Sequence, residues 1–273
     1  MNTDKEWNTF LGSFVLLAVS YIIYFIRYPM WQSFVSVEII SILSILSYFI
    51  VLLVALFLLK KDSKKSLSKV FKNKGNLMIM IGLLFALLYL GLWYLISISL
   101  GSNITFESFP ALRGFESYAI FSLPLAFSLY FVFSIFGAFA EEVTYRGYVQ
   151  TRISSKYGIV LGILVTSLFF SLQHIHVFQT NWLIQFFQTQ FFHVFIFSIF
   201  SGYLYFKSNE NIWSVFAMHA FTNAFSVSVP IIITHTFPFT FHIAEITSFT
   251  VMILILRKLP LRTKTNGISS SKS

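Results

Sequence analysis

The chain has no cysteine and only two aspartates among its 273 residues. Without cysteine it can form neither disulfide bonds nor thiolate metal sites. Charged residues are also scarce, at 11%, whereas 56% of the residues are hydrophobic and the mean hydropathy is +0.77. A soluble domain usually has about 25% charged residues, so this composition is that of a membrane protein.

Long apolar stretches occur along most of the chain. A stretch of about 20 apolar residues is long enough to span a bilayer as a helix, and continuous runs argue against a transmembrane barrel. We therefore predict an all-α, polytopic membrane protein with a single domain over residues 1–273. The expected spans, about eight, lie near residues 9–29, 34–59, 77–100, 119–141, 157–178, 184–206, 211–233 and 240–256. The polar residues at about 260–273 are expected to form a disordered tail.

The distribution of lysine and arginine predicts how these helices are oriented, because cytoplasmic loops are enriched in both residues. If the lysine-rich segment 60–76 is cytoplasmic, eight spans place both termini and 17 of the 19 Lys and Arg residues on that side, leaving Arg27 and Arg113 outside. The net charge of +9 then indicates topology and attraction to anionic lipids rather than nucleic-acid binding. The composition favours a prokaryotic plasma membrane.

The stretch "GAFAEEVTYRGY", residues 137–148, places three charges at the end of an apolar run. A charged residue at the centre of a spanning helix costs roughly 2.5 to 3.5 kcal/mol on insertion scales, so such residues usually mark function. Glu142 and Arg146 are four residues apart and are predicted to pair on one helix face. Glu141 lies about 100 degrees away around the helix and is expected to face a cavity.

Other polar residues in the spans follow the same helical spacing. His219 and Asn223 are four residues apart and share a face. The turn between the fourth and fifth spans is predicted near 154–158, which brings Glu141 and His174 to a similar depth. The polar stretch that follows the glutamates suits water or headgroups, so we expect this hairpin to project into the cytoplasm and the site to open there.

Isolated polar residues elsewhere in the spans have a simpler explanation. A buried histidine or glutamate between helices is more often a structural hydrogen-bonding residue than a catalyst. We interpret these residues in that way: Glu38, His193, His242 and Glu245.

A carboxylate, two histidines and an asparagine have the chemistry needed for hydrolysis. The carboxylate can take a proton from water, while histidine and asparagine can donate hydrogen bonds to the oxyanion that develops on a cleaved carbonyl.

Three ordered motifs give the chain a family resemblance. It resembles the CAAX protease and bacteriocin-processing family (CPBP or Abi) of intramembrane proteases, which includes the Ras-converting enzyme. The similar region covers about residues 119–230, and the spans at about 9–100 rest on hydropathy alone. The matches are EExxxR at Glu141, Glu142 and Arg146, FxxxH at Phe170 and His174, and HxxxN at His219 and Asn223.

The resemblance implies a role for each matched residue. Glu141 would activate water together with His174, and His219 with Asn223 would stabilise the oxyanion. Glu142, Arg146 and Phe170 would support them. We expect no cofactor; the alternative is zinc held by Glu141, His174 and His219, although HExxH is absent. The implied substrate is a peptide or membrane protein, possibly lipidated.

Other intramembrane protease chemistries are excluded by the sequence. The two aspartates, Asp4 and Asp62, lie outside the predicted spans, so an aspartyl dyad is impossible, and no GxSG occurs for a rhomboid-like serine. Two alternatives stay open: a catalytically idle family member acting as a membrane scaffold, regulator or bacteriocin-immunity protein, and a transporter that uses buried carboxylates to carry protons.

Overall fold

The structure is a computed structural model that describes residues 11–23, 36–62, 70–71, 75–106, 123–174, 190–228, 231–234 and 238–261. Its helical elements are Leu11–Ile23, α2 (Val37–Asp62), α4 (Gly75–Ser99), α5 (Leu123–Glu142), the π-helix η3 (Val143–Gln150), α6 (Thr151–Tyr157), α7 (Ile159–Leu172), α9 (Phe191–Lys207), α10 (Ile212–Ser228) and α11 (Pro238–Lys258). Two strands, β1 (Asn103–Phe106) and β2 (Ile231–Thr234), complete the described elements.

The molecule is a multi-pass membrane protein made of apolar helices, as predicted. Four of the described helices are long and apolar enough to cross a membrane, namely Glu38–Lys61, Gly75–Ser99, Pro124–Tyr157 and Thr240–Lys258, and shorter apolar helices accompany them. The number of eight spans and the side on which the termini lie stay predictions. Most of the predicted disordered tail, from residue 262 on, lies outside the described residues.

The outer surface of the bundle is apolar and part of its interior is polar. Phe57 on α2, Met80 on α4 and Val160 on α7 are 64%, 66% and 70% exposed, whereas Glu38 and Glu245 are fully buried. A soluble protein rarely exposes large contiguous apolar surface. The arrangement therefore indicates helices whose outer faces contact lipid.

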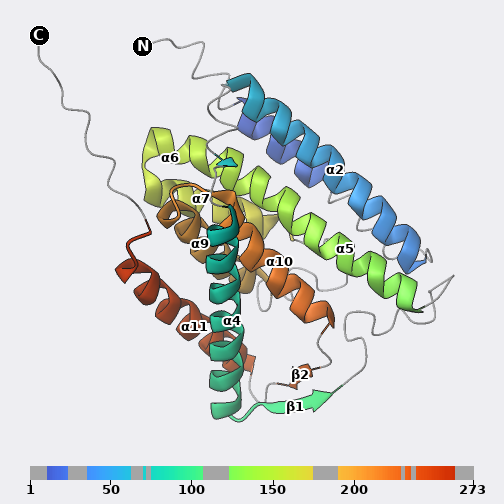
Figure 1. The fold of residues 1–273 in the computed structure, drawn as a ribbon, viewed down its shortest axis with the longest axis vertical. Helices are drawn as coiled ribbons and strands as arrows, with labels where there is room; N and C mark the ends of the chain where they lie inside the picture. The colour runs from blue at the N-terminus through green and yellow to red at the C-terminus, as the bar shows by residue number, and fades with distance from the viewer. Residues whose placement is uncertain are drawn as a thin grey trace, which may run out of the picture.

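Helix α10 lies at the centre of the bundle (Figure 1). It packs against α4, α5 and α9, while α2 lies along α5, α7 packs on α9, and α11 contacts α4 and α9. Helices α4 and α10 approach each other closely at Gly82, where an added Cβ atom would clash with the carbonyl oxygen of Ser214. Small residues at such contacts allow membrane helices to pack backbone to backbone.

The fourth predicted span continues well beyond its expected end at residue 141. α5 runs into η3 and then α6, and the helix stops only at Gly158, whose φ of 89° lies in the left-handed region. The predicted turn near 154–158 is thus confirmed. The prediction that residues 146–156 face water or headgroups is wrong for the part in η3, where every residue is buried, whereas Ser155 and Lys156 of α6 are exposed.

Some of the polar side chains buried in this stretch have hydrogen-bonding partners inside the protein. Gln150 donates from Nε2 to the carbonyl oxygen of Gly202 at 3.0 Å, and Arg152 donates from Nη1 to that of Tyr148 at 3.0 Å. A buried polar group is tolerated once it is hydrogen-bonded.

The end of the seventh predicted span is also corrected. The helix was expected to reach residue 233, but α10 ends at Ser228 and residues 231–234 form β2, which pairs antiparallel with β1 from Asn103 opposite Thr234 to Phe106 opposite Ile231. The sequence reason is local, because Pro230 cannot continue a helix and the β-branched run "IIIT" favours a strand.

Candidate active site

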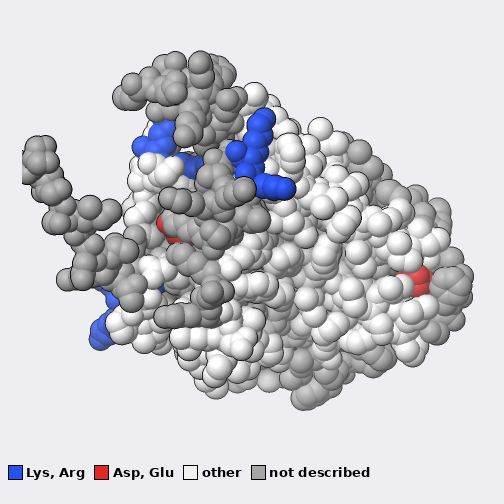
Figure 2. All heavy atoms as spheres, turned by 45° about the horizontal axis from the view of Figure 1, so that its top comes forward, with Lys and Arg blue, Asp and Glu red and all other residues white. Residues whose placement is uncertain are grey.

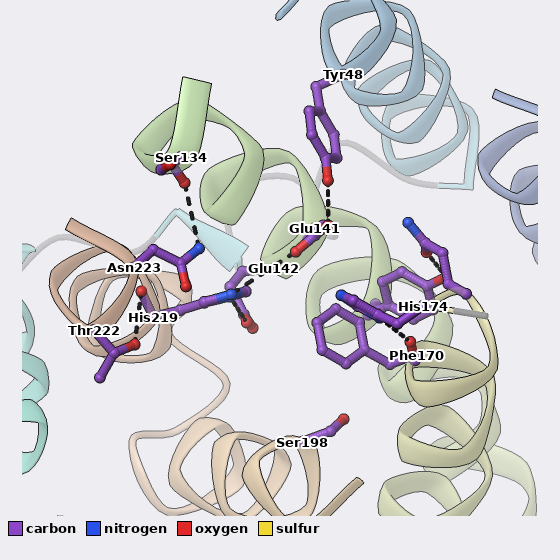
Figure 3. Close-up of polar contacts among 12 residues, drawn as sticks. Tyr48, Ser134, Glu141, Glu142, Phe170, His174, Ser198, His219, Thr222 and Asn223 are labelled. Atoms are coloured by element: carbon purple, nitrogen blue, oxygen red, sulfur yellow. Dashed lines mark hydrogen bonds and ion pairs between the residues drawn. The ribbon is translucent and has the colours of Figure 1, made fainter. Parts of the chain in front are cut away.

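The motif residues come together where α5 passes into η3, where α7 ends, and along the middle of α10 (Figure 3). Two carboxylates, two imidazoles and an amide lie there among aromatic rings.

Glu142 is fully buried and joins two of the predicted motifs. Its Oε2 lies 3.2 Å from Nε of Arg146, which confirms the predicted pair, and its Oε1 lies 2.8 Å from Nδ1 of His219. The contact with His219 was not predicted, because sequence spacing cannot show which helix faces which. Glu142 therefore holds the histidine of α10 as well as the arginine of its own helix.

Arg146 is fully buried and is held in place from α9. Its Nη2 donates to Oγ of Ser198 at 2.8 Å and lies 3.3 Å from the carbonyl oxygen of that residue. The guanidinium carbon also lies 4.7 Å from the centre of the Phe170 ring. Because several partners surround it, the cation stays beside Glu142 without contact with water. Ser198 was missed, since one serine in an apolar helix carries no distinctive signal.

Glu141 is 6% exposed and contacts a different set of groups. Tyr48 of α2 donates its hydroxyl to Oε1 of Glu141 at 2.5 Å, and Oε2 lies 3.8 Å from Nε2 of His219. Figure 3 shows Tyr48 directed at this carboxylate from above. Tyr48 was also missed, because a single tyrosine hydroxyl in a predicted span carries no distinctive signal.

His219 lies between the two glutamates and is 6% exposed. An ionised carboxylate accepts hydrogen bonds but cannot donate them, so the bond with Glu142 requires a hydrogen on Nδ1 and turns Nε2 toward Glu141. The imidazole also packs against two rings, with centroid distances of 5.0 Å to Phe197 and 6.1 Å to Phe170. Such partners fix both the tautomer and the orientation of the ring.

His174 follows the end of α7 and projects toward the same centre (Figure 3). Its Nδ1 lies 2.8 Å from the carbonyl oxygen of Phe170 and therefore carries the hydrogen, and its ring lies 5.0 Å from that of Phe170. Tyr145 of η3 contacts both Phe170 and Gln173. Because Tyr145 is one turn after Glu141 and Phe170 one turn before His174, these contacts agree with the prediction that Glu141 and His174 lie at a similar depth. Phe170 thus connects the arginine and both histidines.

Asn223 and His219 share one face of α10, as their spacing predicts, and both line a cavity of about 550 Å³. Asn223 donates from Nδ2 to the carbonyl oxygen of Ser134 at 3.4 Å. Glu141 was expected to face the cavity, yet neither glutamate is among the described residues that line it. These residues are Tyr89, Leu90, Trp93, Tyr94, Phe170, His174, His193, Val194, Phe197, His219, Thr222, Asn223, Phe225, Ser226 and Phe241.

A second carboxylate–histidine pair lies beside this cavity. His193 of α9 lines it and makes a short hydrogen bond through Nδ1 with the fully buried Glu245 of α11. This contact fits the interpretation of both residues as hydrogen-bonding partners between helices, and it gives the cavity a polar position away from His219.

A metal site would need at least three of the His and Glu side chains close together. Among the described residues, no three His, Cys, Asp or Glu side chains are grouped closely enough to hold a metal ion. In the proposed zinc set, Nδ1 of His174 is bonded to a backbone carbonyl and Nδ1 of His219 to Glu142. These bonds would leave Nε2 of each histidine as the atom able to hold a metal, so zinc stays the predicted alternative, and the proposed mechanism uses no metal.

Comparison with known proteins identifies the region that contains these residues. Residues 121–225 match the family model described as Rce1-like, type II CAAX prenyl endopeptidase. The match covers under half of the chain and includes α5, η3, α6, α7, α9 and most of α10. No curated protein matches the chain. The resemblance indicated by the three motifs is thus confirmed.

Proposed function

From the match of residues 121–225 to the Rce1-like type II CAAX prenyl endopeptidases, we propose that this chain is an intramembrane endopeptidase. It hydrolyses a peptide bond of a membrane-associated peptide or protein, which can be prenylated. The main support is His219, held between Glu141 and Glu142 and sharing a cavity with His174 and Asn223.

Glu141 acts as the general base in this proposal. Its carboxylate takes a proton from a water molecule that attacks the carbonyl carbon, and His174 orients this water through Nε2. General bases of this kind contribute about 10²- to 10⁴-fold to a rate. The short hydrogen bond from Tyr48 fixes one oxygen of Glu141 and leaves Oε2 on the side of His219.

The oxyanion is stabilised from α10. His219 donates from Nε2 when both ring nitrogens carry a hydrogen, while its Nδ1 stays bonded to Glu142. Asn223 donates from its amide, whose described bond to Ser134 is long, at 3.4 Å. One such donor contributes about 10² to 10³ in kcat. The proton on Glu141 then passes to the leaving amine, so that the carboxylate is regenerated.

The central experiment measures peptide cleavage by the purified protein and its Glu141→Gln variant. We expect kcat to fall by about 10²- to 10⁴-fold, because the general base is lost. The control, Glu210→Gln, makes the same chemical change in the turn between α9 and α10 and should leave cleavage intact. Unchanged cleavage by the Glu141→Gln variant would exclude a glutamate mechanism.

The same variant separates the two alternatives in cells. If cleavage is lost while the cellular function persists, the protein acts as a scaffold or regulator. A transporter would instead show proton-coupled flux that requires no cleavage. Substrates can be identified by comparing membrane and secreted peptides between cells with the active protein and cells with the Glu141→Gln variant.

A further inference from the structure

Basic side chains gather at one end of the bundle. Lys60 and Lys61 end α2, Lys156 lies in the last turn of α6, Lys207 ends α9, and Arg257 and Lys258 end α11. Figure 2 shows the blue side chains gathered toward one side of the face it draws. We call these six residues the basic end. By the enrichment of Lys and Arg in cytoplasmic loops, it faces the cytoplasm.

The hairpin of α6 and α7 does not extend beyond this end. Arg146 contacts Ser198, Gln150 contacts Gly202 and Thr151 contacts Tyr205, so the two helices run parallel with an offset of 52 to 54 residues. With this offset, Gly158 at the hairpin turn is level with Glu210, in the turn that follows α9. At about 1.5 Å per residue, Glu141 and His174 both lie roughly 25 Å from the turn.

A packed layer separates the catalytic residues from the basic end. Among the described residues, Tyr145 and Tyr148 of η3, Phe200 and Tyr205 of α9, and Met218 of α10 are each at most 1% exposed. These side chains fill the space between the helices on the side of the site that faces the basic end. Among the described residues, this layer lies between the basic end and the catalytic residues, which argues against entry of a substrate from that end.

The cavity lies on the opposite side of the site. Tyr94 is in the last two turns of α4, His193 in the first turn of α9, Ser226 in the last turn of α10 and Phe241 in the first turn of α11, and all four line the cavity. Each position lies toward the helix end that is farther from the basic end. The same trend holds along α10, where burial changes from 0% at Met218 to an exposed Ser226.

We infer that the substrate reaches His219 and Asn223 from the half of the membrane opposite the basic end. This inference deepens the proposed function, because it assigns the substrate to peptides presented at the extracytoplasmic leaflet. The enzyme would cleave exported or outward-facing peptides. The sequence had predicted an opening toward the cytoplasm, on the assumption that the α6–α7 hairpin projects beyond the bundle.

Cysteine labelling tests this access directly, because the chain has no cysteine of its own. Single substitutions place a thiol in the cavity (Ser226→Cys), at the end of α4 opposite the basic end (Ser99→Cys), or near the basic end (Ser155→Cys). Intact cells or right-side-out vesicles are treated with a membrane-impermeant maleimide, before and after permeabilisation. Thr222→Cys provides a second cavity position in case Ser226→Cys does not fold.

We expect the Ser226 and Ser99 variants to be labelled from outside and the Ser155 variant to be labelled only after permeabilisation. The inference would be overturned if the cavity variants were labelled only under the conditions that label the Ser155 variant, or if neither cavity variant were labelled. It would also be overturned if Ser155→Cys were labelled from outside and Ser99→Cys only after permeabilisation. The readout does not require proteolysis. Failure of the proposed catalytic activity and failure of this access are therefore separate results.

Discussion

At the scale of single residues, the two adjacent glutamates have different surroundings. Glu142 is fully enclosed between Arg146 and His219, whereas Glu141 accepts a hydrogen bond from Tyr48 and faces the other nitrogen of His219. The pair with Arg146 could be predicted from the sequence, because four residues span one helical turn. Tyr48 and Ser198 could not, because contacts between distant helices depend on how the bundle packs.

The hydrogen bond from Tyr48 predicts a measurable catalytic effect. Tyr48→Phe removes only the hydroxyl, and a hydrogen bond to a charged group contributes about 1.5 to 3 kcal/mol. We expect kcat to fall about tenfold to hundredfold, with little change in KM, because Glu141 loses its orientation while the cavity is unchanged. Steady-state kinetics on one peptide would measure both constants.

Tyr203→Phe is the matched control for this prediction. Tyr203 is a partly buried tyrosine of α9 that packs against the core. It lies outside the lining of the cavity among the described residues. Equal losses of kcat in the two variants, or a loss that appears only in KM, would argue against an orienting role for Tyr48.

At the scale of elements, the helices were predicted more accurately than their ends. The positions of α2, α4 and α11 follow from apolar length, and the turn at Gly158 follows from a glycine within a polar stretch. The continuation of α5 through η3 was not predictable in this way. The polar residues of η3 resemble a loop in sequence, and atoms of α9 accept hydrogen bonds from two of the buried ones, Arg146 and Gln150.

The close contact of α4 with α10 predicts a difference between two glycines of one helix. An added methyl group at Gly82 would clash with backbone and side-chain atoms of α10, whereas nothing lies within 4 Å of the corresponding position at Gly91. We expect Gly82→Ala to lower the free energy of unfolding by about 1 to 3 kcal/mol.

Gly91→Ala should leave stability unchanged or raise it by about 0.5 to 1 kcal/mol, because alanine is the better helix former. Thermal unfolding of both variants in the same detergent would provide the comparison. Similar midpoints for the two would mean that α4 and α10 are not in close contact at Gly82.

At the scale of the whole molecule, composition and charge asymmetry indicated a helical membrane protein, and this class is confirmed. The place of the site within the bundle was harder to predict. Residue spacing predicted that Glu141 and His174 lie at the same depth. The side from which a substrate enters depends on which parts of the bundle are filled by side chains, and residue spacing does not show this packing.

The basic end predicts a dependence on lipid charge. A lysine or arginine near an anionic membrane surface contributes about 1 kcal/mol. We expect the thermal midpoint to be higher in vesicles that contain anionic lipid than in zwitterionic vesicles. The difference should shrink in 1 M salt, where the Debye length is about 3 Å.

The combined substitutions Lys60→Gln, Lys61→Gln and Lys156→Gln should reduce this difference at low salt. These side chains are exposed at the ends of α2 and α6. An unchanged lipid dependence in the triple variant would show that the basic end does not contact the anionic headgroups.

The contact between Tyr48 and Glu141 also bears on how the protein can be divided. Tyr48 belongs to α2, which lies outside residues 121–225, the region with the family likeness. α2 packs along α5 and supplies a hydrogen bond to the proposed catalytic base. A fragment trimmed to the matched region would lose that bond and expose the flank of α5. A fragment that keeps the hydrogen bond to the proposed catalytic base therefore has to include α2, and a split version of the protein would need both pieces in the same membrane.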